Sequence, residues 1–165
     1  MGKSPLVERF FPKKASNEFD INILGKTKET ISSCDPLAPG QEYRNQIKDA
    51  LEVAGWSGKV FLEHDSKRYI DGIFEGIGLV VQMGNKGAAT SYLMNLEYLF
   101  SQGKITSAIF VTQTKKQAIR RYSIGHPNAR PNDDGNYMGI ERLEADLGIF
   151  SAFLRCPICV VAIDC

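Results

Sequence analysis

Two unbroken apolar runs constrain the fold of this chain most strongly. Residues 108–111 read Ala-Ile-Phe-Val, and residues 158–163, close to the end of the sequence, are also apolar throughout. A strand with one face in solvent alternates apolar and polar residues, whereas a strand covered on both faces does not. Both runs therefore predict buried strands of a sheet that is flanked by helices.

Other segments show the periodicity of helices and strands around these two runs. Apolar side chains recur at helical spacing in three segments: 41–54, 88–102 and 139–154. Three shorter β-rich runs, which we expect to form a meander, lie between the first two helices: 59–63, 68–75 and 78–83. Glycines favour a tight turn at 76–78. The first 38 residues show no clear pattern apart from a candidate strand at 19–24.

Length and charge limit the class of protein. The 165 residues fit a single domain spanning 1–165. A net charge of +1 excludes a protein that binds nucleic acid through bulk positive charge, as histones do. No apolar run approaches the roughly 18 residues of a membrane span, and the charged start lacks the apolar centre of a secretory signal. We therefore expect a soluble, cytoplasmic protein.

Cys156 and Cys159 form a Cys-x-x-Cys pair, which invites a redox or a zinc interpretation. A redox pair opens a helix, but this pair leads into the last predicted strand. A zinc site needs two further ligands at suitable spacing, and the remaining candidates are scattered along the chain: Cys34, His64, His126 and Cys165. We expect reduced, structural cysteines.

Asp71 and Gln82 carry the clearest chemical signal. Asp71 lies in the second β-rich run, and Gln82 follows eleven residues later in the third. With its order of one helix, three strands, a helix and a strand (αβββαβ), the chain resembles the PD-(D/E)XK nuclease superfamily. The spacing of the two residues resembles type II restriction endonucleases of the BglII and BstYI kind. The resemblance covers about residues 41–112 well and implies an α/β restriction-endonuclease-like core, a mixed β-sheet flanked by helices, with residues 139–163 adding a helix and the final strand.

The resemblance also implies an activity, which is Mg²⁺-dependent hydrolysis of phosphodiester bonds in duplex DNA. A hard divalent cation held by carboxylates stabilises charge on phosphate oxygens. By this resemblance Asp71 would anchor the ion, the main-chain carbonyl of Val81 would be a second ligand, and Gln82 would orient water or a phosphate oxygen. A symmetric homodimer is expected, because a palindromic DNA site matches a two-fold protein.

Val80 departs from the family pattern, because the family has its catalytic Glu at this position, nine residues after the Asp. Valine neither binds a cation nor accepts a proton. One interpretation is that the carboxylate has moved to Glu75 or to Glu42, although these also suit a turn and a first helical turn. Another is a catalytically inactive nuclease-fold protein that still binds DNA. The structural alternative for Asp71 is a strand-end residue that caps a turn or pairs with Arg68.

Candidates for DNA contacts begin just after the third β-rich run. Asn85 stands where the resembling enzymes read a base, and Lys86 lies at a strand-to-helix boundary that suits a phosphate. Residues 113–137 form a candidate DNA-recognition loop, and no acidic residue occurs between Glu97 and Asp133. The expected contacts in this loop are Lys115, Lys116, Arg120, Arg121, His126, Asn128 and Arg130. Grouped cations neutralise phosphates, and the alternative is a solvated helix face.

Overall fold

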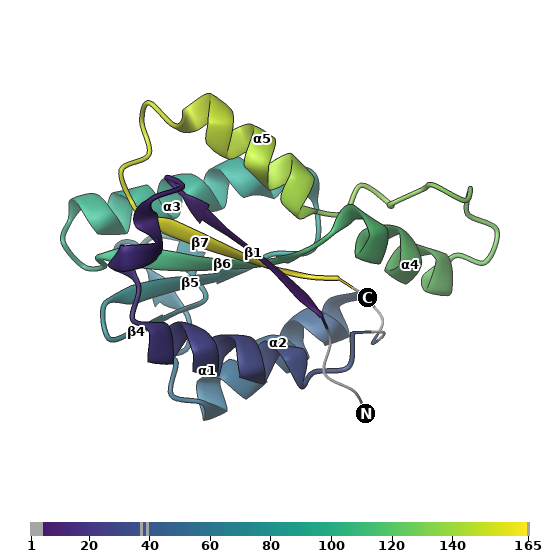
Figure 1. The fold of residues 1–165 in the computed structure, drawn as a ribbon, viewed down its shortest axis with the longest axis horizontal. Coiled ribbons are helices and arrows are strands. Elements are labelled where there is room, and N and C mark those ends of the chain that lie inside the picture. The colour runs from purple at the N-terminus through teal and green to yellow at the C-terminus, as the bar shows by residue number, and fades with distance from the viewer. Residues whose placement is uncertain (1–4, 37, 39, 165) are drawn as a thin grey trace.

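A five-stranded mixed sheet forms the centre of the molecule (Figure 1). The computed structural model describes residues 5–36, 38 and 40–164. The strand order is β1-β7-β6-β5-β4, and the strands are β1 (Leu6–Phe11), β4 (Gly72–Phe74), β5 (Ile77–Val81), β6 (Ser107–Gln113) and β7 (Ile158–Ile163). Strands β5, β6 and β7 run parallel, whereas β1 and β4 pair antiparallel at the two edges.

The two apolar runs become the central strands β6 and β7. Every residue of both strands is buried. They pair in parallel over a register from Ala108 with Ile158 to Gln113 with Ile163. Because helices cover both faces of these strands, neither face contacts solvent, and apolar residues need not alternate with polar ones. The prediction of two buried strands is confirmed, and so is the α/β class of the fold.

Two pairs of helices cover the two faces of the sheet (Figure 1). The pairs are α1 (Ile21–Ser32) with α2 (Gly40–Val53), and α3 (Ala89–Ser101) with α5 (Ile140–Phe150). The core accordingly divides into two apolar clusters, with Leu79 and Val81 of β5 facing the α1–α2 side and Val80 facing the α3–α5 side. In the part of the chain that the structure describes, no helix is long and apolar enough to span a membrane.

The N-terminal segment differs from the expected strand at 19–24, which is wrong. Residues 6–11 form the strand instead, and a short 3₁₀ helix, η1 (Ala15–Glu18), follows it. The carboxylate of Asp20 then caps α1 by accepting the N–H groups of Asn22 and Ile23 at 2.7 and 3.1 Å. Apolar and polar residues alternate at the start of α1, which is a pattern typical of a strand. The N-terminal cap and a buried stripe at helical spacing favour a helix more strongly. The stripe consists of Leu24, Thr27 and Ile31.

The β-rich runs do not form one continuous meander. Strands β2 (Val60–Phe61) and β3 (Tyr69–Ile70) pair in a separate two-stranded sheet, while β4 and β5 form a hairpin of the main sheet. The hairpin turns at Glu75 and Gly76, which have φ of 47° and 78°, rather than at 76–78. The chain passes from one sheet to the other at Asp71, which lies between β3 and β4.

The expected loop at 113–137 contains a helix, α4 (Lys115–Gly125). The Thr114 hydroxyl caps it by accepting the N–H of Gln117 at 3.2 Å. Helix α4 projects from the edge of the molecule, and the polar chain after it runs outward and back (Figure 1). A projecting helix packs little of its surface on the core, so few of its residues have to be apolar. Sparse burial explains why helical periodicity is weak in this segment.

The paired cysteines are buried thiols. Burial, reinforced by the charge of Glu97, raises the pKa of Cys156 to about 12, and burial with Glu8 raises the pKa of Cys159 to about 12. Protonated, buried thiols are inert, which supports their structural role. Cys34 and both members of the pair are free of disulfides, and Cys165 lies outside the described residues.

Gly72 provides a test of the packing around Asp71. A Cβ at position 72 would lie 2.5 Å from the carbonyl oxygen of Ser57, which belongs to the backbone. We expect Gly72→Ala to lower the free energy of unfolding by about 1–3 kcal/mol, because this backbone must move. Urea denaturation measures the effect.

Gly25 is the matched control, since it lies in α1 and a Cβ there would meet nothing within 4 Å. Gly25→Ala is expected to stabilise the protein by roughly 0.5–1 kcal/mol. Similar effects of the two substitutions would contradict the close contact at Gly72.

Candidate functional site

Asp71 is fixed against the end of β5. Its main-chain N–H donates to the carbonyl of Leu79 at 2.8 Å, and its carboxylate accepts the N–H of Val81 at 2.8 Å. The side chain of Asp71 is 0% exposed. Val81 is the last residue of β5, so this carboxylate lies at the carboxyl end of a parallel strand. In α/β sheets this is the edge where ligands bind.

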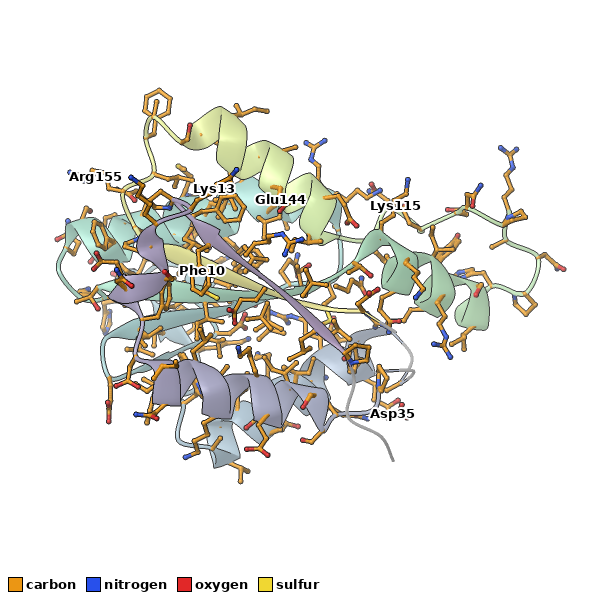
Figure 2. The ribbon with its side chains drawn as sticks, viewed as in Figure 1. Phe10, Lys13, Asp35, Lys115, Glu144 and Arg155 are labelled. Atoms are coloured by element: carbon orange, nitrogen blue, oxygen red, sulfur yellow. The ribbon has the colours of Figure 1, made fainter. Side chains whose placement is uncertain are left out.

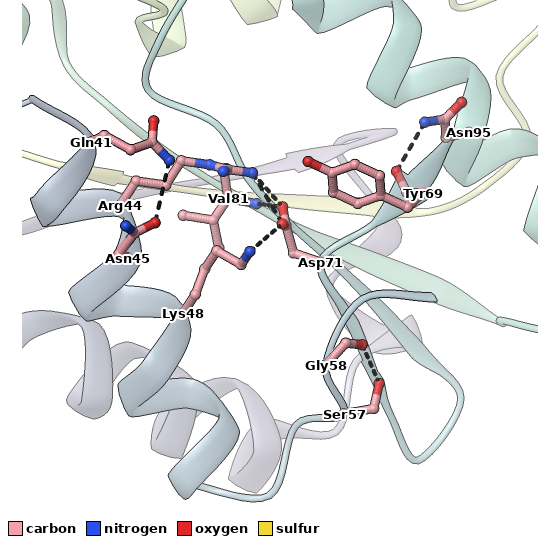
Figure 3. A network of polar contacts seen from close by, with 10 residues as sticks. All are labelled: Gln41, Arg44, Asn45, Lys48, Ser57, Gly58, Tyr69, Asp71, Val81 and Asn95. Carbon is pink, nitrogen blue, oxygen red and sulfur yellow. Dashed lines mark hydrogen bonds and ion pairs between the residues drawn. The ribbon is translucent and has the colours of Figure 1, made fainter. Parts of the chain in front are cut away.

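Arg44 of α2 connects the Asp71 carboxylate to the main-chain carbonyl of Val81 (Figure 3). Its Nη2 donates to Asp71 Oδ1 at 3.0 Å and to Oδ2 at 3.4 Å, while its Nε donates to the Val81 oxygen at 2.6 Å. The Arg44 guanidinium therefore contacts both groups that the sequence predicts as metal ligands, the Asp71 carboxylate and the Val81 carbonyl.

Lys48 brings a second cation to the same carboxylate. Its Nζ lies 3.2 Å from Asp71 Oδ1. Residues four apart share a helix face, and Arg44 and Lys48 directly follow Tyr43 and Ile47, which are fully buried and hold α2 on the sheet. Two positive charges thus meet one negative charge. Sequence reasoning missed this pair, although two cations four residues apart beside a buried helical stripe are a detectable signal.

Glu42 and Glu75 are not among the residues that pair with Asp71 in the part of the chain that the structure describes. Glu42 is exposed and accepts a hydrogen bond from Gln46 Nε2 at 3.3 Å. Glu75 is exposed in the turn at the other end of the β4–β5 hairpin. The interpretation that the catalytic carboxylate moved to one of these residues gains no support from these contacts and stays a prediction. The carboxylate of Asp71 pairs with Arg44 and Lys48 of α2, not with the nearby Arg68.

Val80 and Gln82 flank Val81 on β5. Val80 is 0% exposed and packs in the apolar cluster on the α3–α5 side. A carboxylate at this position would be buried among apolar side chains, which is costly unless a partner of opposite charge pairs with it. Gln82 directly follows Val81 and is also buried, with its main-chain N–H donating to the Val111 carbonyl at 2.9 Å. Of the two, only Gln82 has a polar side chain, and it directly follows Val81 in the sequence.

The oxygens of Asp71 and Val81 suit a hard divalent cation. One guanidinium reaches both, so the two oxygens face a common point. Mg²⁺ binds through one or two carboxylates when waters and a substrate phosphate complete its coordination. Arg44 and Lys48 do not suit such an ion, because they hold the same oxygens with positive charge. A divalent cation therefore fits these donors once both side chains have moved away.

Arg121 stabilises the ends of β5 and β6 from within the protein. It is 7% exposed, and its Nη1 donates to Gln113 Oε1 at 2.9 Å. Its guanidinium lies 4.9 Å from the ring centroid of Tyr43. Burial lowers the pKa of Arg121, against the opposing effects of Tyr43 and Tyr137. Helix α4 thus turns Arg121 inward, a position that does not favour the predicted DNA contact of this residue.

The other basic residues of this region are accessible. Figure 2 shows side chains standing out along α4 and the chain after it, starting from Lys115. The exposed candidates are Lys115, Lys116, Arg120, His126, Asn128 and Arg130. His126 stacks on Tyr122 with ring centroids 4.1 Å apart. The structure therefore gathers these six candidates on one projecting segment.

Asn85 and Lys86 lie at η2 (Lys86–Ala88), a 3₁₀ turn that leads into α3. Asn85 Oδ1 accepts the N–H of Gly87 at 2.8 Å, and Lys86 Nζ lies 2.5 Å from Asp134 Oδ2. Burial opposes ionisation of Asp134, but hydrogen bonds from Lys86 and from the N–H of Asn136 outweigh it and lower the pKa. A DNA phosphate would have to compete with Asp134 for Lys86.

Comparisons with known proteins agree with this architecture. A family model described as restriction endonuclease BglII/BglIII matches residues 14–163. No curated protein matches the sequence significantly. Among solved structures, the chain is similar to the crystal structure of restriction endonuclease BglII complexed with a DNA 16-mer. The TM-score is 0.74 at 13% identity, over 96% of this chain and 76% of that chain. At this identity the structural likeness shows a shared fold.

The adjacent residues Arg120 and Arg121 test the inward turn of α4. We expect Arg121→Ala to lower the free energy of unfolding by about 2–3 kcal/mol, because Gln113 Oε1 loses its donor in a buried place. Arg120 is exposed, so Arg120→Ala should change the stability by no more than about 0.5 kcal/mol. Urea denaturation of both variants provides the comparison, and equally small losses would refute the buried role of Arg121.

Proposed function

The chain belongs to the restriction endonuclease BglII/BglIII family, its function is that of a type II site-specific deoxyribonuclease, and we propose that its target is a short palindromic sequence in duplex DNA. One observation supports the proposed reactive centre: the Asp71 carboxylate and the Val81 carbonyl converge at the carboxyl end of β5. This convergence occurs in a fold shared with a restriction endonuclease.

The proposed DNA surface is the projecting segment formed by α4 and the chain that follows it. Exposed cations on this segment neutralise phosphates and hold the duplex. Its exposed amide and imidazole groups, on Asn128 and His126, have the donors and acceptors needed to contact base edges. Asn85, close to Asp71 along the chain, is the further candidate for adenine, although its Oδ1 must then leave the N–H of Gly87.

The proposed reaction centre consists of Asp71, the carbonyl of Val81 and Gln82. The Val81 N–H holds the Asp71 carboxylate in a fixed direction. The amide of Gln82 both donates and accepts, so it can orient water or a phosphate oxygen. Restriction endonucleases generally use divalent metal ions. We propose Mg²⁺ here, held by Asp71 and Val81, where such an ion would stabilise charge on the phosphate oxygens.

We also propose that the working protein is a symmetric homodimer. A palindromic site presents two equivalent half-sites, and a two-fold protein places one reaction centre on each. Each protomer would then contribute its own Asp71 and its own α4 segment to one strand of the duplex.

A catalytically inactive DNA-binding protein of the same fold is the second candidate. Two observations favour it: Val80 is buried among apolar side chains, and Arg44 and Lys48 pair with Asp71. The described residues contain no group of three or more His, Cys, Asp or Glu side chains that could hold a metal ion. Such a protein would bind duplex DNA equally well with and without divalent cations.

DNA cleavage decides between the two candidates. We expect the purified chain with Mg²⁺ to cut a long duplex of known sequence into discrete fragments, visible on a gel, and EDTA to stop cutting. Asp71→Asn should lower the cleavage rate by about 100-fold or more, because it removes the negative charge of the reaction centre.

Asp49→Asn is the matched control for cleavage, since Asp49 is an exposed carboxylate elsewhere on α2. Its rate should equal that of the unaltered chain. Cutting that survives in a folded Asp71→Asn variant would overturn the assignment of Asp71. Duplex binding without any cutting would favour the inactive protein.

The salt dependence of DNA binding tests the α4 surface. We expect Lys116→Ala and Arg120→Ala each to reduce the slope of log affinity against log salt concentration by about 1, because each removes one phosphate contact. Lys26→Ala is the control, since it removes an exposed lysine from α1, which lies outside the proposed α4 surface. Fluorescence anisotropy with a labelled duplex gives the slopes, and identical slopes for all three variants would exclude α4 from the DNA surface.

A further inference from the structure

Arg44 and Lys48 fill the position that the proposed metal ion would take. The guanidinium of Arg44 contacts the Asp71 carboxylate and the Val81 carbonyl at 2.6 to 3.4 Å. The ammonium of Lys48 lies 3.2 Å from the same carboxylate. Both side chains are 13% exposed, whereas that of Asp71 is 0% exposed. The two cations are thus more accessible to solvent than the carboxylate that they contact.

The charges of this cluster oppose a divalent ion. One carboxylate with two fixed cations has a formal charge of +1 before any metal arrives. Like charges repel strongly where little water screens them, so both cations oppose the approach of a dication. An incoming dication would have to displace two donors from Asp71 and one from Val81 while approaching both positive charges.

We propose that Arg44 and Lys48 keep divalent cations out of the Asp71–Val81 oxygen pair in the DNA-free protein, and that they bind a DNA phosphate when the site opens. The proposal extends the function given above, because it concerns the same reaction centre. It gives α2 two phosphate-binding residues that the sequence pattern left unassigned. The two cations thereby couple the arrival of the metal to the arrival of the substrate.

A cavity next to Arg44 provides room for the exchange. It has a volume of about 120 Å³ and is lined by Gln41, Arg44, Met83, Gly84, Arg121 and Tyr137. Two guanidinium-bearing residues line it and no carboxylate does, so the cavity favours an anion. Arginine and lysine both bind phosphate oxygens readily. Rotation of the Arg44 side chain into this cavity would free the Val81 carbonyl and one side of Asp71.

Metal binding without DNA tests the exclusion. We compare Mn²⁺ titrations by calorimetry for the unaltered chain, Arg44→Gln/Lys48→Gln, and the same double variant with Asp71→Asn. We expect no Asp71-dependent Mn²⁺ binding by the unaltered chain, at least tenfold tighter binding by the double variant, and loss of that binding in the triple variant. Lys26→Gln/Lys67→Gln removes the same net charge from exposed positions and should behave as the unaltered chain.

Two results would overturn the exclusion. One is Asp71-dependent Mn²⁺ binding by the unaltered chain as tight as in the double variant, and the other is no Mn²⁺ site in a folded double variant. Circular dichroism establishes folding, and Lys48→Gln alone, which leaves Arg44 in place, is the milder variant and should show intermediate affinity. Because these titrations contain no DNA, their failure is distinct from a failure of cleavage.

Duplex binding in EDTA tests the phosphate contact. Removal of both cations in Arg44→Gln/Lys48→Gln should lower the salt slope by about 2, since each residue accounts for one phosphate. An unchanged slope would show that these residues do not bind phosphate and would overturn that half of the proposal.

Discussion

The buried carboxylate of Asp71 connects the parts of this structure that its chemistry depends on. It accepts the N–H of Val81 at the end of β5, and it pairs with Arg44 and Lys48 on α2. A helix, a strand end and the junction between two sheets therefore meet at one side chain. A buried carboxylate is tolerated only when such partners surround it, so the packing of α2 in this position supplies the partners that the burial of Asp71 requires.

Burial of the central strands gives this site a rigid base. Strands β6 and β7 are covered on both faces, and β5 continues the parallel arrangement to the edge where Asp71 lies. By contrast, α4 projects from the sheet and buries few side chains. Asp71 thus lies beside the buried sheet, whereas the proposed DNA contacts of α4 lie on an exposed, projecting segment. Such a division suits an enzyme that must adapt to a duplex while it holds its reacting groups still.

Much of this architecture could be predicted from the sequence. The helix expected at 41–54 is observed as Gly40–Val53, and the one at 88–102 as Ala89–Ser101. Both have long apolar stripes, which specify a helix without further information. Helices α1 and α4 could not be found in this way, because their buried stripes are short or polar. The inward position of Arg121 could not be predicted either. A basic residue on a mostly polar helix is expected to face solvent, and nothing local in the sequence indicates that Arg121 contacts Gln113 and Tyr43.

The sequence by itself determined the family resemblance and the α/β class, and it predicted Asp71 and Gln82 as site residues, because residue spacing and strand periodicity are local properties of the chain. Only the tertiary structure decided what surrounds Asp71. Arg44 lies 27 residues from Asp71 and 37 from Val81 along the chain, and no local pattern relates them. The packing of α2 on the sheet brings their charges together, and that packing makes two cations the neighbours of the proposed metal ligands.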